Sequence, residues 1–296
     1  MGEVILEERP NVINVQPSVR ADPHGGFLVA DKRESQVRRY HLDGSLDFAF
    51  GSPGQGPEEF VGAVVSVRLP DQSILVVDRT SKIVTLDPSG NRVTRQWQLP
   101  LTNIVDADVI DDSRILFSVR ASASRPLLHI WNINKGELER HFFIPPQNSQ
   151  IRAASIIGGW AFASIQNDTI WSFFSAVDSV YAFSTEGVRL MAVRIPFERF
   201  DIARPPRRVF GIRFGSFDEW IGSFHLISSI AALEDLLLIQ YGRYGRNPQV
   251  SLLGMTTAGA RVFEHLLVVT PYPPITAYFQ ARETSEPNRW IAASIR

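Results

Sequence analysis

Asp106 and Asp108 are the residues of this chain best placed for metal chemistry, because they lie two positions apart in the run DADVIDD. Residues two apart on a β-strand share a face, and carboxylate oxygens suit a hard cation such as calcium. Other common catalytic patterns are missing: the sequence has no cysteine, no G-x-S-x-G elbow, and six dispersed histidines without H-x-H or H-E-x-x-H spacing. We therefore expect no cofactor in the leading interpretation, with a divalent metal at Asp106 and Asp108 as the alternative.

A second group of residues combines arginine with aromatic side chains, mostly within residues 197–222. Arginine forks bind carboxylate or phosphate groups bidentately, and aromatic rings stack on the bases of single-stranded nucleic acid. The same composition also suits a segment that folds back over the mouth of the fold, so three interpretations stay open. Among the ligands, we expect a protein or peptide in preference to RNA. The candidate binding residues, including those in the neighbouring segment 242–249 and one near residue 120, are Arg204, Arg207, Arg208, Phe210, Arg213, Trp220, Arg243, Tyr244, Arg246 and Arg120.

Recurring glycine turns predict the elements that position these residues. The turns end in Gly44, Gly90, Gly136, Gly187 and Gly259, at spacings of 46, 46, 51 and 72 residues. Each turn lies between two short runs rich in Val, Ile, Phe, Trp and Leu, and two further runs complete the unit. One unit of four antiparallel strands copied along the chain is typical of a propeller, whereas a β-sandwich does not require such a repeat. The interval of 72 residues places an insertion at about 197–222.

The chain ends predict the number of units. Runs at 275–281 and 289–295 match the second and third strands of a sixth unit, and the chain then ends without a fourth strand. A strand at 4–7 can complete that unit, while 12–16 begins the first unit and 151–157 begins the fourth. Closing the ring in this way leaves no open sheet edge. We predict a single all-β domain over 1–296, a six-bladed β-propeller with four antiparallel strands per blade, the last blade closed by the N-terminal strand.

One stretch of the chain resembles a known family. The runs FGSPGQGPEEF (50–60), SILVVD (73–78), KIVTLD (82–87) and SGNRV (89–93) resemble the NHL repeat, in which a G-x-x-G-x-G-P-x-x-F loop joins two blades. The match covers about residues 20–100, and later units have Val119 or Arg120, Ser175 and Tyr241 where the family has Asp. The resemblance implies a six-bladed propeller. Such propellers mostly bind proteins, a few bind RNA, and related rings include metal-dependent lactonases and a zinc lyase.

This fold would separate the charges of a chain whose net charge is only −1. Connections between the second and third strands of a blade, and between successive blades, share one end of the blades, which we name the loop face. It has a basic bias that includes Lys32, Arg33 and Arg79. The opposite turn face is acidic, through Asp22, Asp43, Asp71, Asp87, Asp111, Asp112, Asp168, Glu186, Glu234 and Asp235. Because aspartate is favoured in tight turns, where its carboxylate accepts hydrogen bonds from nearby backbone N–H groups, we expect a structural role for the acidic face.

Bulk composition limits the classes of function. With 44% hydrophobic and 21% charged residues the chain can bury a core, and no apolar run reaches the length of a membrane span. The start MGEVILEERP lacks the cationic and apolar regions of a signal peptide, so either the protein is cytosolic or a leader is absent from this chain. We expect a monomeric, non-catalytic binding module that uses the loop face to bind a protein or another anionic partner. The alternatives are a metal-dependent hydrolase of the lactonase type and a sensory or structural domain of a larger envelope protein.

Overall fold

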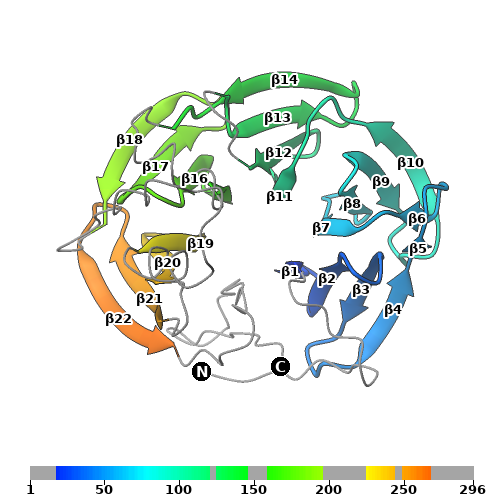
Figure 1. Ribbon diagram of the computed structural model, residues 1–296, viewed down its shortest axis with the longest axis horizontal. Coiled ribbons are helices and arrows are strands. Elements are labelled where there is room, and N and C mark those ends of the chain that lie inside the picture. Colours follow the sequence, from blue (N-terminus) through cyan, green and yellow to red (C-terminus); the bar gives the residue numbers. More distant parts are fainter. Residues whose placement is uncertain (1–17, 121–124, 146–158, 196–224, 244–248, 268–296) are drawn as a thin grey trace, which may run out of the picture. The chain divides into compact units, whose positions relative to one another are not determined.

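The computed structural model describes residues 18–120, 125–145, 159–195, 225–243 and 249–267. Within these ranges the chain forms five four-stranded antiparallel sheets and no helix (Figure 1). It follows that none of the described segments is a helix able to cross a membrane. The strands of each sheet follow one another in sequence order, which is the topology of a propeller blade. The prediction of an all-β propeller fold is confirmed.

The five sheets are numbered here as blades 1 to 5. Blades 1 and 2 contain β1 (Ser18–Ala21), β2 (Phe27–Asp31), β3 (Gln36–Tyr40) and β4 (Leu46–Phe50), then β7 (Ala63–Arg68), β8 (Ile74–Asp78), β9 (Lys82–Leu86) and β10 (Val93–Gln98). A short parallel pair, β5 (Ser52–Pro53) and β6 (Glu59–Phe60), lies in the connection between them. Blade 3 contains β11 (Ile104–Val109), β12 (Arg114–Val119), β13 (Leu128–Asn132) and β14 (Glu137–Phe142). Blades 4 and 5 contain β15 (Ala161–Gln166), β16 (Thr169–Phe174), β17 (Ser179–Ser184) and β18 (Arg189–Arg194), then β19 (Leu226–Leu233), β20 (Leu236–Arg243), β21 (Gln249–Thr256) and β22 (Arg261–Leu267).

Two of the predicted first strands were wrong. The first strand of blade 4 is β15 and not 151–157, because Gln166 pairs with Thr169 across a two-residue turn. Both turn residues, Asn167 and Asp168, have positive φ angles of 47° and 58°, the geometry of the tight hairpins that link adjacent strands. The first strand of blade 1 is likewise β1 and not 12–16, because the turn before β2 pairs it with Ser18–Ala21.

The prediction of six blades differs from the described structure, which has five. The strands assigned to the sixth blade, at 4–7, 275–281 and 289–295, lie outside the described residues.

The chain divides into two compact units, so the prediction of a single domain stays a prediction. Described residues of the first unit lie in Met1–Val119 and Ile130–Glu139, and those of the second lie in Arg120–His129 and Arg140–Ile275. Blades 1 and 2 belong to the first unit and blades 4 and 5 to the second, while the strands of blade 3 are divided between them.

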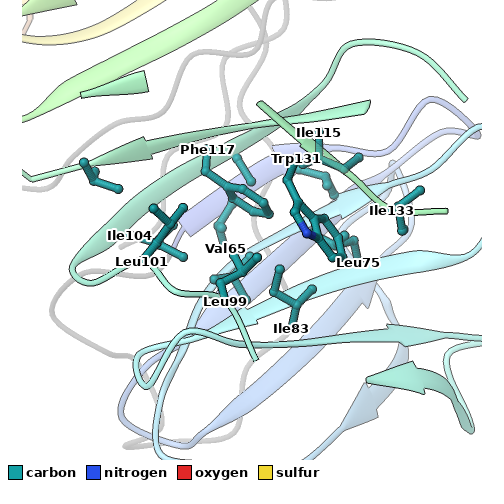
Figure 2. Packing of buried hydrophobic residues seen from close by; sticks show 14 of the residues in the cluster. Val65, Leu75, Ile83, Leu99, Leu101, Ile104, Ile115, Phe117, Trp131 and Ile133 are labelled. Atoms are coloured by element: carbon teal, nitrogen blue, oxygen red, sulfur yellow. The ribbon is translucent and has the colours of Figure 1, made fainter. Parts of the chain in front are cut away.

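Successive residues of β8 face opposite sides of blade 2 and supply two separate cores of the first unit. Ile74 and Val76 pack in a cluster with residues of blade 1, whereas Leu75 and Val77 pack in a cluster with residues of blade 3. Figure 2 shows the second cluster, in which Leu75 lies beside Trp131. Burial on both faces explains why the inner strands are continuous apolar runs rather than alternating ones.

The second unit repeats this arrangement between blades 4 and 5. Its core includes Phe173 and Val180 from blade 4 with Ile239 and Leu253 from blade 5, all almost fully buried. The outer strand β18 contributes only its C-terminal part to this core and otherwise remains exposed.

The recurring glycines of blades 2 to 5 each pack against the outer strand of the preceding blade. Gly90 of blade 2 lies against the ring of Phe48 on β4, and Gly136 of blade 3 lies against Trp97 on β10. In the second unit Gly187 lies against Phe142, and Gly259 lies against Val193. All four glycines have φ between 70° and 93°, a region that residues with a Cβ rarely adopt. The period of the sequence therefore reflects one contact that is repeated from blade to blade.

Candidate binding face

The described part of the loop face brings two cations from neighbouring blades together in the first unit. Lys32 lies in the turn between β2 and β3, and Arg79 lies in the turn between β8 and β9. Gly62 joins them: its carbonyl accepts a hydrogen bond of 2.9 Å from the Arg79 N–H, and a Cβ on Gly62 would lie 3.1 Å from the Lys32 carbonyl oxygen. Arg33 follows Lys32 and is also exposed.

These three cations are exposed and form no ion pair within the described residues. Within the described residues, none of the ion pairs involves Lys32, Arg33 or Arg79. The side chain of Lys32 reaches solvent, yet the surrounding chain still desolvates it. This burial, and then the positive charge of Arg79, lowers the pKa of Lys32. The electrostatic potential at this point would favour an anionic group of a partner.

Two buried aspartates hold the turns that present these cations. Asp31 accepts hydrogen bonds from the backbone N–H groups of Arg33 (2.9 Å) and Glu34 (3.0 Å). Asp78 accepts from Val61 (2.7 Å), Gly62 (3.1 Å) and Thr80 (2.7 Å), so it ties the connection between the blades to the turn that carries Arg79. Charge-assisted hydrogen bonds of this kind give the turns a fixed geometry.

The glycine-rich connection at 50–60 is an ordered part of the same face. Phe60 is fully buried and its ring lies edge-on to Phe50, with centroids 6.3 Å apart. Lys82 Nζ donates to the carbonyls of Gly56 (2.9 Å) and Glu59, and lies 5.3 Å from the centroid of the Phe60 ring. The Glu59 carboxylate accepts from the Gly56 N–H at 2.8 Å. These contacts tie the glycine-rich connection to β9 of blade 2.

Few of the candidate binding residues predicted from sequence lie in the described part of the chain. Arg120 follows β12 and Arg243 ends β20, and both are exposed. The other candidates lie outside the described residues: Arg204, Arg207, Arg208, Phe210, Arg213, Trp220, Tyr244 and Arg246. Their role stays a prediction.

The acidic turn face has the structural role that was predicted for it. Asp43, Asp71 and Asp111 each accept hydrogen bonds from the backbone N–H and the hydroxyl of the serine two residues later. These bonds from Ser45 lower the pKa of Asp43. A pocket of about 270 Å³ lies among the turns of blades 2 and 3, where Asp71 and Asp87 line it. Because both carboxylates are already bonded within their own turns, we do not assign a ligand to this pocket.

The predicted metal ligand Asp106 is bonded to an arginine. Arg20 on β1 donates to the Asp106 carboxylate and, at 3.0 Å, to the carbonyl of Ala107 on β11. Asp108 accepts from the N–H of Val109 at 2.9 Å. Among the residues that the structure describes, no group of three potential ligands converges on a metal position. A guanidinium beside Asp106 competes with a cation for the same oxygens, so the described residues do not fit a metal centre.

The pairing of Arg20 with Asp106 was not foreseen from the sequence. The prediction placed the first strand of blade 1 at 12–16, which left Arg20 in a connection. The available signal was the short run Ser18–Ala21 directly before the turn, in the same position relative to the turn as β7 and β11 in their blades.

Comparisons with known proteins identify the fold but no family. No protein-family model matches the chain, and no curated protein matches it. Among solved structures, a putative exported protein from Bacteroides fragilis matches with a TM-score of 0.61 and 12% identity, covering 88% of this chain and 74% of that one. A member of the DUF4221 family from Bacteroides vulgatus matches with a TM-score of 0.60 and 11% identity, covering 89% and 84%. A structure of BBS1N in complex with ARL6DN matches with a TM-score of 0.50 and 14% identity, covering 93% and 73%. At these identities the similarity concerns the fold alone.

Proposed function

We propose that this chain is a non-catalytic binding module that recognises an acidic protein or peptide through its loop face. The observation that carries the proposal is the group formed by Lys32, Arg33 and Arg79, which are exposed, close together and without acidic partners in the described residues. Arginine and lysine in such a position raise the rate of encounter with an anionic partner and orient it.

The comparisons add limited support. The BBS1N structure holds a second protein, ARL6DN, so a protein with a similar fold binds another protein. Protein binding is also what the NHL resemblance implies. We also propose, from the sequence alone, that Arg204, Arg207 and Arg208 contribute to binding. A variant with all three replaced should then lose binding to the acidic partner.

A direct test uses a fluorescein-labelled poly-glutamate peptide and fluorescence anisotropy. The variant Lys32→Gln/Arg79→Gln removes two positive charges from the loop face, and Arg92→Gln/Arg95→Gln removes two from the exposed end of blade 2 near β10. Exposed charge pairs contribute about 0.2–1 kcal/mol each, so the first variant should weaken binding by about 2- to 30-fold and the second should not weaken it. Added salt should weaken binding by the unaltered protein.

The outcomes separate the candidate partners. If both variants weaken binding equally, the attraction is a property of net charge and the loop-face proposal is wrong. If the loop-face variant loses affinity for oligouridine but not for poly-glutamate, the ligand is RNA rather than protein.

We also propose that six blades form the complete ring and that the protein is a monomer. Gly44 in the β3–β4 turn has a φ of 89°, within the range of 70° to 93° of the four glycines that lie against a preceding blade. Its counterpart in a closed ring would be the outer strand of a sixth blade, which supports the count obtained from the sequence.

The metal-dependent hydrolase remains the alternative prediction, and no described residue favours it. Adding calcium or zinc to the purified protein and following thermal unfolding tests it. A rise in the melting temperature that Asp106→Asn abolishes, with unchanged stability in the absence of metal, would favour the hydrolase.

A further inference from the structure

Four exposed apolar side chains lie at the end of blade 3 and on the outer edge of blade 4. Ile144, Val188, Leu190 and Met191 expose 56%, 52%, 57% and 43% of their surface. They are four of the seven large apolar side chains that are exposed in the described residues. We name these four residues the edge patch. Scattered exposed apolar residues are ordinary, but a group of them marks a surface that contacts something else.

Aromatic contacts within the second unit bring the four residues together. Gly187 lies against Phe142, since a Cβ on this glycine would be 2.7 Å from the ring. The rings of Phe142 and Phe143 lie 5.1 and 5.3 Å from that of Phe183. The end of β14 is thereby held against the turn that leads into β18, and Ile144 and Val188 follow this contact by two residues and one residue.

The backbone also directs the patch outward. Ala182 pairs with Met191 and Phe183 pairs with Arg189, so Leu190 is the extra residue of a β-bulge. The bulged positions of blades 1 and 2 hold polar residues, Asp47 and Thr94. Bulges and charged side chains normally protect outer strands from pairing with other chains. Blade 4 keeps the bulge but places Leu190 at its centre, and blade 5 places Val262 at the same position.

The charges around the edge patch are mostly positive, although the exposed Glu186 lies two residues before Val188. The strand β18 contains no acid; it begins with Arg189, whose guanidinium carbon lies 5.0 Å from the Tyr181 ring centroid, and ends with Arg194. Arg194 is paired with Asp178 at 2.8 Å. Arg140, two residues before Phe142 and therefore on the same face of β14, is exposed. In the described part of the second unit, neither Arg140 nor Arg189 forms an ion pair.

This charge decides between possible occupants. A second copy of the chain would place the same arginines against each other across a symmetric contact. A partner segment with large apolar residues flanked by carboxylates would instead bury the patch and neutralise Arg140 and Arg189. We propose that the edge patch is a second docking surface, which binds a protein segment of mixed apolar and acidic character. This proposal does not depend on the function proposed for the loop face.

The test uses a fluorescein-labelled peptide in which two phenylalanines and a leucine are flanked by glutamates, with poly-glutamate as a comparison. The variant Leu190→Thr/Met191→Thr removes apolar surface while keeping residues that suit a strand. Its matched control, Leu46→Thr/Val262→Thr, removes exposed apolar surface from β4 and β22. We expect the first variant to weaken binding of the mixed peptide about tenfold, and the control to bind as the unaltered protein does. Thermal unfolding of all variants checks that the fold is kept.

Charge is tested separately. Arg140→Gln/Arg189→Gln should weaken binding of the mixed peptide, and Lys32→Gln/Arg79→Gln should not. Loss of binding only in the Lys32/Arg79 variant would assign the peptide to the loop face and overturn the inference. So would an unaffected Leu190/Met191 variant, or no binding of the mixed peptide. A concentration-dependent dimer in analytical ultracentrifugation, abolished by Leu190→Thr/Met191→Thr, would replace the partner with a second copy.

Discussion

The contacts of the recurring glycines yield a graded prediction for two otherwise similar substitutions. Gly90 and Gly136 have nearly equal φ angles of 73° and 70°. An alanine Cβ at position 90 would lie 2.3 Å from the ring of Phe48, whereas at position 136 it would lie 3.3 Å from the nearest atom of Trp97. Both substitutions strain the backbone by a similar amount, but only Gly90→Ala forces a neighbouring side chain to move.

The magnitudes follow from these two effects. A residue with a Cβ in the left-handed region costs about 1–2 kcal/mol, which is the expected loss for Gly136→Ala. Overpacking adds about 1–3 kcal/mol. Because the nearest atom to position 90 is the tip of the Phe48 ring, which can turn aside, the added cost should lie near the lower end of that range. We expect Gly90→Ala to lower the free energy of unfolding by about 2–4 kcal/mol in total.

Urea denaturation of the two variants, of Phe48→Ala and of Phe48→Ala/Gly90→Ala measures this difference. The double variant should be less destabilised than the sum of its single changes, because removing the ring leaves only the backbone strain at position 90. Equal destabilisation by Gly90→Ala and Gly136→Ala would contradict this reasoning. So would strict additivity of the Gly90→Ala and Phe48→Ala effects, because either result would show that the Phe48 ring does not clash with a side chain at position 90.

Further changes test other parts of the account. Burial alone would raise the pKa of Asp22, but hydrogen bonds from Arg68 and Arg39 lower it below its usual value. The stability that this carboxylate contributes is therefore complete above pH of about 4 and is lost as the pH falls through its lowered pKa in the folded state. Asp22→Asn should cost about 3 kcal/mol at neutral pH and flatten the acid limb of a stability profile, measured by urea titrations. Asp78→Ala should leave buried N–H groups without an acceptor and cost about 2–4 kcal/mol, with faster hydrogen exchange at 61–62 as the readout. If a sixth blade packs on Gly44, Gly44→Ala should cost as much as Gly90→Ala in the same urea assay, whereas a loss limited to backbone strain would count against that blade.

The strands could be read from the sequence because their signals are local. A turn glycine and the apolar runs beside it are close in sequence, so the four-stranded unit could be predicted from them. The structural role of the aspartates on the acidic turn face could be predicted for the same reason. The hydrogen bond from the Ser73 N–H to the Asp71 carboxylate, for example, spans only two residues. The turn at Asn167 and Asp168 contains no glycine or proline, so the strand before it was predicted at the wrong residues.

The contacts between residues far apart in the sequence could not be predicted from local patterns. Arg20 and Asp106 are 86 residues apart, and no local pattern links them, so the sequence did not reveal that one of the two predicted metal-binding carboxylates is bonded to an arginine. The exposure of Leu190 could not be predicted either. The sequence of β18 resembles that of a buried apolar strand, and only the strand order shows that β18 lies at the edge of its sheet. The cations Lys32 and Arg79 were assigned correctly to one face, but their proximity depends on the backbone of Gly62.

The most direct test of binding through the loop face is photo-crosslinking from single positions. A photoreactive phenylalanine analogue replaces Arg33 on the loop face or, in a second protein, Ser89 on the turn face; both positions are exposed. The labelled poly-glutamate peptide should crosslink from position 33, lose that crosslink at high salt, and give none from position 89. Crosslinking from position 89 alone, or equally from both positions, would contradict the proposed binding face.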